Sequence, residues 1–437
     1  MKRPQELAYF GGDKVVKKAL QPMKTITTDE VQAASKVLKT GILSSFLGAP
    51  GPGFLGGKEV RQLEEKAANL FGVKHVLSVN SWTSGLIAAI GAIGLEPGDE
   101  VITTPWTMCA TATAILHWNC IPIFADIDAE TFNVSVDSVK RVITKRTKAI
   151  LAVDIFGRPC DAPGLRKLAD SLGLFLITDT AQAPGIKHSA DNKTVGTHAH
   201  IGGYSLNCHK HIQCGEGGLV VTDSDDLAQR VALIRNHGEA VVSAGTSENI
   251  ANILGYNFRL GEIEAAIASA QLDKLETRVD DRRRVAKQLY EGLHSLPGLF
   301  IEKNIMDEPH AFYVFGMRLG LEELDITRNQ LATALRSEGI EGVMEGYQNV
   351  HLLPMFRRKI AYGSTGFPWN LSDSGREIEY KPGMCPIAEE LHNQTFLGLN
   401  ICLHQYSTEE LDQTVNAFHK VWANISEVRT IDISEKN

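Results

Sequence analysis

Between about residues 58 and 235, amphipathic helical patterns alternate with short runs of β-branched and other apolar residues. The series begins with a helical pattern at 58–71 and the apolar run HVLSV at 75–79. It continues with apolar runs at 120–127 and 174–179, each preceded by a helical pattern. Because a helix returns the chain after each strand, this alternation predicts an α/β fold with a mostly parallel sheet and helices on both faces.

A different pattern follows the alternating region. One long helical pattern covers residues 262–293, and its strongly charged second half predicts a helix that leaves the first domain. Beyond it, strands and helices mix in an α+β arrangement, and residues 355–383 are irregular, which is typical of functional loops. We therefore predict a large domain at 1–275 and a smaller α+β domain at 276–437.

The composition restricts the class of protein. The 437 residues include 44 Lys and Arg against 52 Asp and Glu, a net charge of −8, which gives no basic footprint for nucleic acid. No apolar run reaches the roughly 20 residues that span a bilayer, and the first residues lack the apolar core of a signal peptide. We expect a soluble, cytoplasmic protein that binds neither nucleic acid nor membrane.

Cysteine and histidine spacings do not favour a metal site. The seven cysteines form no CxxC pair, and the histidine pairs 198/200 and 209/211 have no matching thiol spacing. Zinc sites and disulfide frameworks require such paired spacings. We expect reduced thiols and no metal.

Three polar segments follow apolar runs, at the place where open parallel sheets bind ligands. Residues 80–85 begin a helix, whose free backbone N–H groups suit a phosphate. Asp179 ends the run at 174–179. Ser205 and Lys210 follow the run IGGYSL and precede a glycine-rich turn.

Together, these parts point to pyridoxal phosphate. An anion site, a carboxylate and an amine are the groups that hold its phosphate, its ring nitrogen and its aldehyde. Taken alone, each has a simpler explanation: a carboxylate after a strand usually caps a helix, and a Gly-Gly pair usually marks a turn. Their order on one predicted sheet favours the cofactor.

Four separated motifs strengthen this interpretation. They are Asp179 to Ala183, Ser205 to Lys210 with Glu216-Gly217-Gly218, Gly255-x-Asn257-x-Arg259 followed by Gln271-Leu272, and Tyr347-x3-His351-x2-Pro354. In this order they resemble the DegT/DnrJ/EryC1/StrS sugar aminotransferases, which are fold type I pyridoxal-phosphate enzymes. The resemblance implies an aspartate-aminotransferase-like large domain with a mostly parallel mixed sheet.

The resemblance also implies the catalytic residues. Lys210 would bind the cofactor aldehyde and then move a proton between the substrate carbon and the cofactor. Asp179 would keep the ring nitrogen protonated. Relatives that are sugar dehydratases have His at the lysine position, and His209 and His211 flank Lys210 here. A pyridoxamine-phosphate-dependent dehydratase is therefore the first alternative, and a non-catalytic cofactor-binding regulator is the second.

The remaining cofactor-binding residues are implied in the same way. Thr83, with the backbone N–H of Trp82 and with Ser205, would hold the phosphate, and Gln182 would lie near the ring hydroxyl. Asn257 resembles a residue that reaches the phosphate of the neighbouring subunit. We therefore expect a homodimer with shared active sites.

Three positions depart from the family pattern. The phosphate turn usually reads Gly-Thr but is Trp82-Thr83 here, and a bulky residue fits only with a negative φ and space for its ring. The aromatic that stacks on the cofactor falls at Met108, so either Met108 covers the ring or Trp106 or Trp82 does. Asp154 stands where relatives often have His.

The implied reaction moves an amino group from an amino acid, L-glutamate in relatives, to a ketosugar. The loops at 41–57 and 355–383 are candidates for the acceptor site. The long glycine- and aromatic-rich segment hints at a less common acceptor: an inositol-type ketone, an aminobenzoate precursor, or 8-keto-3-deoxyoctulosonate. The last would place the chain in the 8-amino-3,8-dideoxyoctulosonate transaminase branch of lipopolysaccharide biosynthesis.

Overall fold

A computed structural model describes residues 6–242, 250–303, 305–371 and 377–433. Its main sheet has seven strands in the order β1-β7-β6-β5-β4-β2-β3. They are β1 (His75–Val79), β2 (Glu100–Thr103), β3 (Ile121–Phe124), β4 (Thr147–Val153), β5 (Phe175–Asp179), β6 (Ile201–Ser205) and β7 (Gly218–Thr222). Strand β7 is antiparallel to both its neighbours, and the other neighbouring pairs are parallel. The predicted mostly parallel mixed sheet is confirmed.

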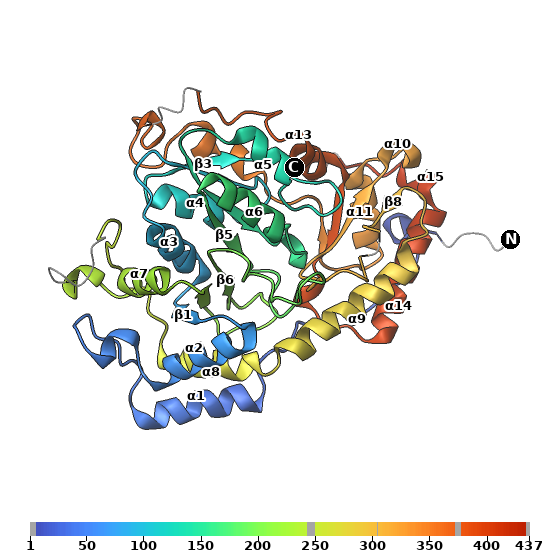
Figure 1. Cartoon of the computed structure of the whole chain (residues 1–437). Helices are drawn as coiled ribbons and strands as arrows, with labels where there is room; N and C mark the ends of the chain where they lie inside the picture. The colour runs from blue at the N-terminus through green and yellow to red at the C-terminus, as the bar shows by residue number, and fades with distance from the viewer. Residues whose placement is uncertain (1–5, 243–249, 304, 372–376, 434–437) are drawn as a thin grey trace.

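Helices cover both faces of this sheet (Figure 1). On β1, Leu77 and Val79 pack into one core with α3, α4 and α7, whereas Val76 packs into another with α2 and α8. This alternation follows from the two-residue period of a strand. The helices of the large sheet are α1 (Thr28–Thr40), α2 (Lys58–Phe71), α3 (Trp82–Ala92), α4 (Ala110–His117), α5 (Val136–Val142), α6 (Ala162–Leu172), α7 (Asp225–Arg235) and α8 (Glu262–Leu272).

Helix α3 lies close against the sheet because its residues are small. It begins after Ser81, whose hydroxyl accepts a hydrogen bond from the Ser84 backbone N–H. Gly85, Ala88 and Ala89 are buried along the helix and leave no bulk between it and the strands. The start of α3 is thereby fixed at the carboxyl end of β1.

A second, antiparallel sheet has the strand order β10-β11-β9-β8. Its strands are β8 (Leu299–Phe300), β9 (Phe315–Leu319), β10 (Val343–Met344) and β11 (Phe396–Leu399). Helices α9 (Leu275–Leu293), α11 (Arg328–Ser337) and α14 (Thr408–Ala423) form a core with it. The short helices of this half are α10 (Leu321–Leu324), α12 (Pro354–Arg357), α13 (Pro386–Glu390) and α15 (Ile425–Val428).

The helical pattern at 262–293 is two helices rather than one. Helix α8 packs against α1 and α2, whereas α9 packs against α14 and continues toward the second sheet (Figure 1). Lys274, at the junction, donates through Nζ to Glu30 Oε1 of α1 at 2.7 Å. The buried face changes core within α9, because Leu275 and Val279 lie in the core of α8 whereas Val285 and Leu289 lie in the core of the second sheet.

The chain crosses from the core of one sheet to the core of the other more than once. Leu7, Val16 and Leu20 pack into the core of the second sheet, although they precede the large one. Conversely, Phe356 and Tyr380 pack into the core beside β3, and the Tyr380 hydroxyl donates to the Pro122 carbonyl at 2.7 Å. Much of the segment at 355–383 is therefore held against the large sheet. The division near residue 275 stays a prediction.

Candidate active site

A cavity of about 380 Å³ lies at the carboxyl ends of the large sheet's central strands. Val153, Asp179 and Ser205, which end β4, β5 and β6, face it. Seven of the eight predicted site residues line it: Trp82, Thr83, Met108, Asp179, Gln182, Ser205 and Lys210. The eighth, Asn257, is exposed and does not line this cavity.

Asp179 is buried, and both of its carboxylate oxygens accept hydrogen bonds. Its Oδ1 accepts hydrogen bonds from Trp82 Nε1 at 2.7 Å and from the Ala181 backbone N–H at 3.2 Å. Its Oδ2 accepts from the Thr111 hydroxyl at 2.9 Å. Burial raises the pKa of Asp179, and these donors together with the charge of Lys210 act in the opposite direction. A turn rather than a helix follows β5, so Asp179 is not a helix cap.

Lys210 enters the same cavity from the loop after β6. Its Nζ lies 4.5 Å from the centroid of the Tyr313 ring. Burial lowers the pKa of Lys210, and the charge of Asp179 partly offsets that effect. A lysine with a lowered pKa is a better nucleophile and proton carrier, because more of it is neutral.

The flanking histidines do not replace the lysine. The His211 ring is buried, with Nε2 2.7 Å from the Ala311 carbonyl oxygen, and burial lowers its pKa to about 4. His209 faces the cavity but is exposed. The side chain that lies under Tyr313 in this cavity is therefore an amine and not an imidazole.

The three candidates for stacking on the cofactor ring occupy different places. Trp106 is fully buried, outside the cavity, with Nε1 donating to Asn349 Oδ1 at 3.1 Å. Trp82 lines the cavity, but its indole is engaged with Asp179. Met108 lines the cavity and is 58% exposed, and its Sδ accepts from the Ala110 backbone N–H at 3.1 Å. Met108 and Trp82 therefore lie at the cavity, and Trp106 does not.

Gln182 connects the cavity to the end of β4. Its Oε1 accepts from the Phe156 backbone N–H at 2.7 Å, and its Nε2 donates to the Tyr347 hydroxyl at 3.4 Å. Phe156 has φ +58°, a left-handed conformation that costs free energy and persists where the surroundings enforce it. Gln182 is one of the groups that enforce it.

The residues present fit pyridoxal phosphate. The first-turn amides of α3, at Trp82 and Thr83, have no acceptor within the helix, and the Ser205 hydroxyl lies on the same cavity. These groups suit a phosphate, Asp179 suits a protonated ring nitrogen, and Lys210 suits an aldehyde. The volume is within the range of small-molecule sites.

Among the cavity residues that the sequence analysis did not identify, two contact the proposed catalytic side chains. Thr111 lies in the hydroxyl-rich start of α4, a region we considered only for the stacking residue. Tyr313 comes from the segment before β9, where its backbone N–H donates to the Phe156 carbonyl at 2.8 Å. The first could have been found from its spacing to Met108, whereas no local pattern indicates that Tyr313 reaches Lys210.

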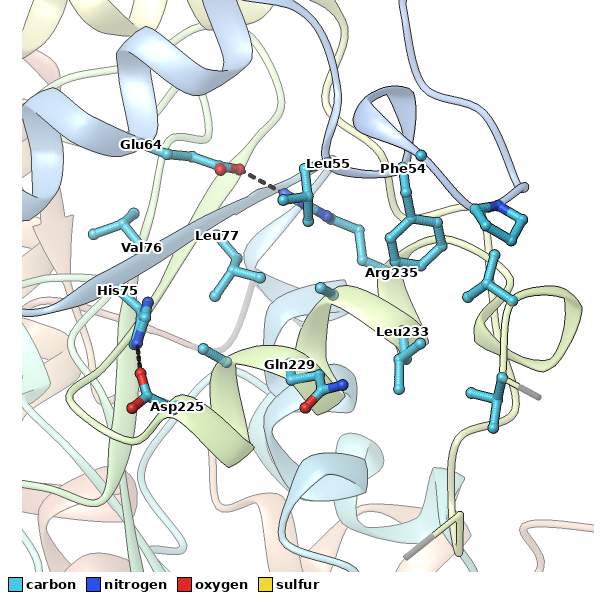
Figure 2. A pocket seen from close by; sticks show the side chains of 16 residues that line it. Phe54, Leu55, Glu64, His75, Val76, Leu77, Asp225, Gln229, Leu233 and Arg235 are labelled. Carbon is cyan, nitrogen blue, oxygen red and sulfur yellow. Dashed lines mark hydrogen bonds and ion pairs between the residues drawn. The ribbon is translucent and has the colours of Figure 1, made fainter. Parts of the chain in front are cut away.

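Neither candidate acceptor loop, at 41–57 or at 355–383, contributes to the cavity in the described part of one chain. The loop at 41–57 instead borders a larger pocket, of about 560 Å³, at the β1 edge of the sheet. Figure 2 shows side chains from α2, β1 and α7 around it, with Glu64 bonded to Arg235 and His75 to Asp225. This pocket contains no lysine and is distinct from the cavity at Asp179.

Two further observations concern the described residues alone. No three His, Cys, Asp or Glu side chains among them gather closely enough to hold a metal ion. None of their helices combines the length and apolar character needed to cross a bilayer.

Known proteins share this architecture. The profile of the DegT/DnrJ/EryC1/StrS aminotransferase family matches residues 49–386. The chain belongs to this family. GDP-perosamine synthase from Vibrio cholerae is 34% identical over 331 residues, which cover 75% of this chain and 87% of that relative.

Solved structures agree with this assignment. The crystal structure of DesI with its TDP-sugar product matches with a TM-score of 0.77 and 26% identity, and covers 99% of each chain. The GDP-4-keto-6-deoxymannose-3-dehydratase ColD matches with a TM-score of 0.72, 24% identity, and coverage of 92% of this chain and 100% of that one. The second likeness shows the fold alone.

Family membership confirms the predicted enzyme class. The chain is a sugar aminotransferase, and pyridoxal phosphate is its cofactor. In this family member, an amine, a carboxylate and the start of a helix lie on the cavity described above.

Asp154 forms hydrogen bonds to the segment that carries Asp179. Its Oδ1 accepts from the Cys160 backbone N–H at 2.8 Å, its Oδ2 accepts from the Thr180 hydroxyl at 2.7 Å, and its own N–H donates to the Asp179 carbonyl. Burial raises the pKa of Asp154 from 3.8 to about 6. Between these values the native protein keeps a proton that the unfolded chain has released.

Stability should therefore fall as pH rises from about 4 to 6, by up to about 3 kcal/mol from this residue. Asp154→Asn removes the titration, because the amide keeps an oxygen for Cys160 but carries no charge. We expect the free energy of unfolding of the variant, relative to wild type, to increase across this range. Denaturant unfolding at pH 4, 5, 6 and 7 measures it, and parallel pH profiles for the two proteins would show the prediction to be wrong.

Proposed function

We propose that this enzyme transfers an amino group from L-glutamate to a ketosugar by a ping-pong mechanism in which Lys210 and Asp179 are the catalytic residues. The observation that carries the proposal is the placement of these two side chains, 31 positions apart, on one cavity. When bound, pyridoxal phosphate supplies an aldehyde that carries the amino group and a protonated ring that withdraws electrons.

The protein's own groups have distinct tasks. Lys210 Nζ would bind the cofactor aldehyde and would carry a proton to and from the substrate carbon. Asp179 would hold the proton on the ring nitrogen, because an ionised carboxylate stabilises the charged form. The start of α3, with Thr83 and Ser205, would hold the phosphate, and Gln182 would lie near the ring hydroxyl. Tyr313 covers the amine and limits its contact with water.

The amine at position 210 supports the aminotransferase over the dehydratase alternative. A dehydratase of this fold would present an imidazole in place of the lysine, and here His211 is directed to a backbone carbonyl instead. The likeness to ColD, at 24% identity, does not alter this assignment.

Substitution of the lysine tests the mechanism. Lys210→Ala should lower the transamination rate by at least about 10²- to 10⁴-fold, because the proton carrier is lost. Borohydride reduction should fix the cofactor to wild type at Lys210 but not to this variant, as peptide mass spectrometry would show. His209→Ala should still be labelled at Lys210. Borohydride fixation of the cofactor to another lysine of the wild-type chain, or an undiminished transamination rate in Lys210→Ala, would contradict the assignment.

We also infer that the enzyme is a homodimer whose sites are shared. Asn257 is exposed and away from its own cavity, although it matches a residue that contacts phosphate in relatives. Asn236 joins the end of α7 to the loop at 41–57, because its Nδ2 donates to the carbonyls of Leu47 and Phe54. Leu47, in the loop at 41–57, is 63% exposed, and Leu254, three residues before Asn257, is 65% exposed. Burial of such side chains against a second copy of the chain would be favourable, which supports the proposed dimer.

Complementation tests the shared site. Asn257→Asp places a negative charge where the phosphate is expected, so this variant and Lys210→Ala should each have little activity. Co-expressed, they should give about a quarter of wild-type activity, because half of the dimers are mixed and each has one complete site. If Asn257 served its own subunit, the mixture would stay as inactive as its components. Analytical ultracentrifugation would confirm that mixed dimers form.

For the acceptor, we propose 8-keto-3-deoxyoctulosonate as the first ketosugar to test. Support comes from the glycine- and aromatic-rich segment at 355–383, which short nucleotide-sugar enzymes of the family are not expected to have. The enzyme would first be loaded with glutamate, and 2-oxoglutarate should form. Return of the aldehyde absorbance should then follow addition of the octulosonate but not of nucleotide-linked 4-ketosugars. Return with the nucleotide-linked sugars alone would refute this acceptor.

A further inference from the structure

The indole of Trp82 occupies a space at the cavity that two glycines leave open. A Cβ atom on Gly203 of β6 would lie 2.2 Å from Trp82 Cζ3, and one on Gly85 of α3 would lie 2.6 Å from Cε3. A Cβ atom on Gly218 of β7 would lie 2.8 Å from the Trp82 backbone N and Cα, so this third glycine lets the start of α3 approach β7. The missing side chains at Gly203 and Gly85 therefore leave room for the indole.

The hydrogen bonds of Asp179 leave one acceptor position unused. An ionised carboxylate offers about four lone-pair positions. Trp82 Nε1 and the Ala181 N–H occupy the two on Oδ1, and the Thr111 hydroxyl occupies one on Oδ2. The remaining position is therefore on Oδ2, and Asp179 faces the cavity.

The indole differs from the other side-chain donor in what it can do. An indole N–H can only donate, so it bonds the charged carboxylate and cannot accept a proton from the acid. The Thr111 hydroxyl can donate or accept, and it also contacts the Thr107 hydroxyl at 2.7 Å. Trp82 is thus the side-chain donor that binds Oδ1, and Oδ2 keeps the unused acceptor position.

We propose that Trp82 is a positioning residue whose indole N–H holds Asp179 Oδ1, so that Oδ2 is left for the protonated ring nitrogen of the cofactor. This inference rests on the proposed function, which assigns Asp179 to that nitrogen. It also gives a role to a residue at which this chain departs from the Gly-Thr phosphate turn of the sequences it resembles. The contribution of Trp82 to catalysis is through Asp179.

The test compares two tryptophans. Trp82→Phe keeps an aromatic ring but removes the N–H. Trp118→Phe is the matched control, because Trp118 is equally buried, packs on Gly91 of the same helix, and donates at 2.7 Å to the backbone carbonyl of Ile87 instead. A hydrogen bond to a charged group corresponds to about 10- to 100-fold. We expect Trp82→Phe to weaken pyridoxal phosphate binding to the apoenzyme by this factor and Trp118→Phe to change it by less than about threefold.

A second expectation separates positioning from packing. Trp82→Phe should lower kcat by a similar factor and leave KM for the amino donor nearly unchanged. In an Asp179→Ala background it should cause little further loss of cofactor affinity, because the group on which it acts is absent. If the fold-changes in cofactor affinity of the two substitutions multiply, the effect of Trp82 does not pass through Asp179. Trp82 then has only a packing role, and the proposal is overturned. Wild-type affinity in Trp82→Phe overturns it as well.

If Trp82→Phe fails to fold, the NMR resonances of the indole N–H groups test the hydrogen bond instead. The chain has five tryptophans, and ¹⁵N-tryptophan labelling of the full-length apoenzyme reports each indole N–H. Asp179→Ala should move one indole resonance strongly, and an unchanged set of indole resonances refutes the hydrogen bond. Wild-type cofactor affinity in Asp179→Ala would instead show that the proposed function itself is wrong. The two failures are therefore distinguishable.

Discussion

The site depends on a buried carboxylate that has to remain charged. Asp179 ends β5, and burial alone would favour its neutral acid. Donors from three segments act against burial and lower the pKa: Trp82 at the start of α3, Thr111 in the first turn of α4, and the backbone of Ala181. Helices α3 and α4 share one face of the sheet and one core, so the packing of that core positions two of the three donors.

The amine and the ring that covers it come from two distant segments of the chain. Lys210 comes from the loop after β6, which Gly215 turns back at φ +88°, a conformation suited to glycine. Tyr313 comes from the segment before β9 and covers the amine. Lys210 and Asp179 each favour the charged form of the other, while burial opposes both charges. The pKa values of Lys210 and Asp179 therefore depend on each other, and a bound cofactor would change both.

Periodicity predicted the elements whose neighbours are uniform along their length. The helix at 58–71 and the strand at 75–79 agree with the structure, since each presents one consistent buried pattern. The pattern at 262–293 was misleading, because no local signal marks the interruption between Leu272 and Leu275 or the later change from one core to the other within α9. The space for the indole of Trp82 could not be predicted from neighbouring residues either, since it requires Gly203, more than a hundred residues away.

The sequence by itself determined the alternation of helices and strands, the order of the anion site, carboxylate and amine, and the family motifs, because these are properties of neighbouring residues. Tertiary structure alone decided which side chains meet: Trp82 with Asp179, Tyr313 with Lys210, and Asn257 facing away from its own cavity. Such contacts join residues far apart in the chain, and strand order and helix packing bring them together.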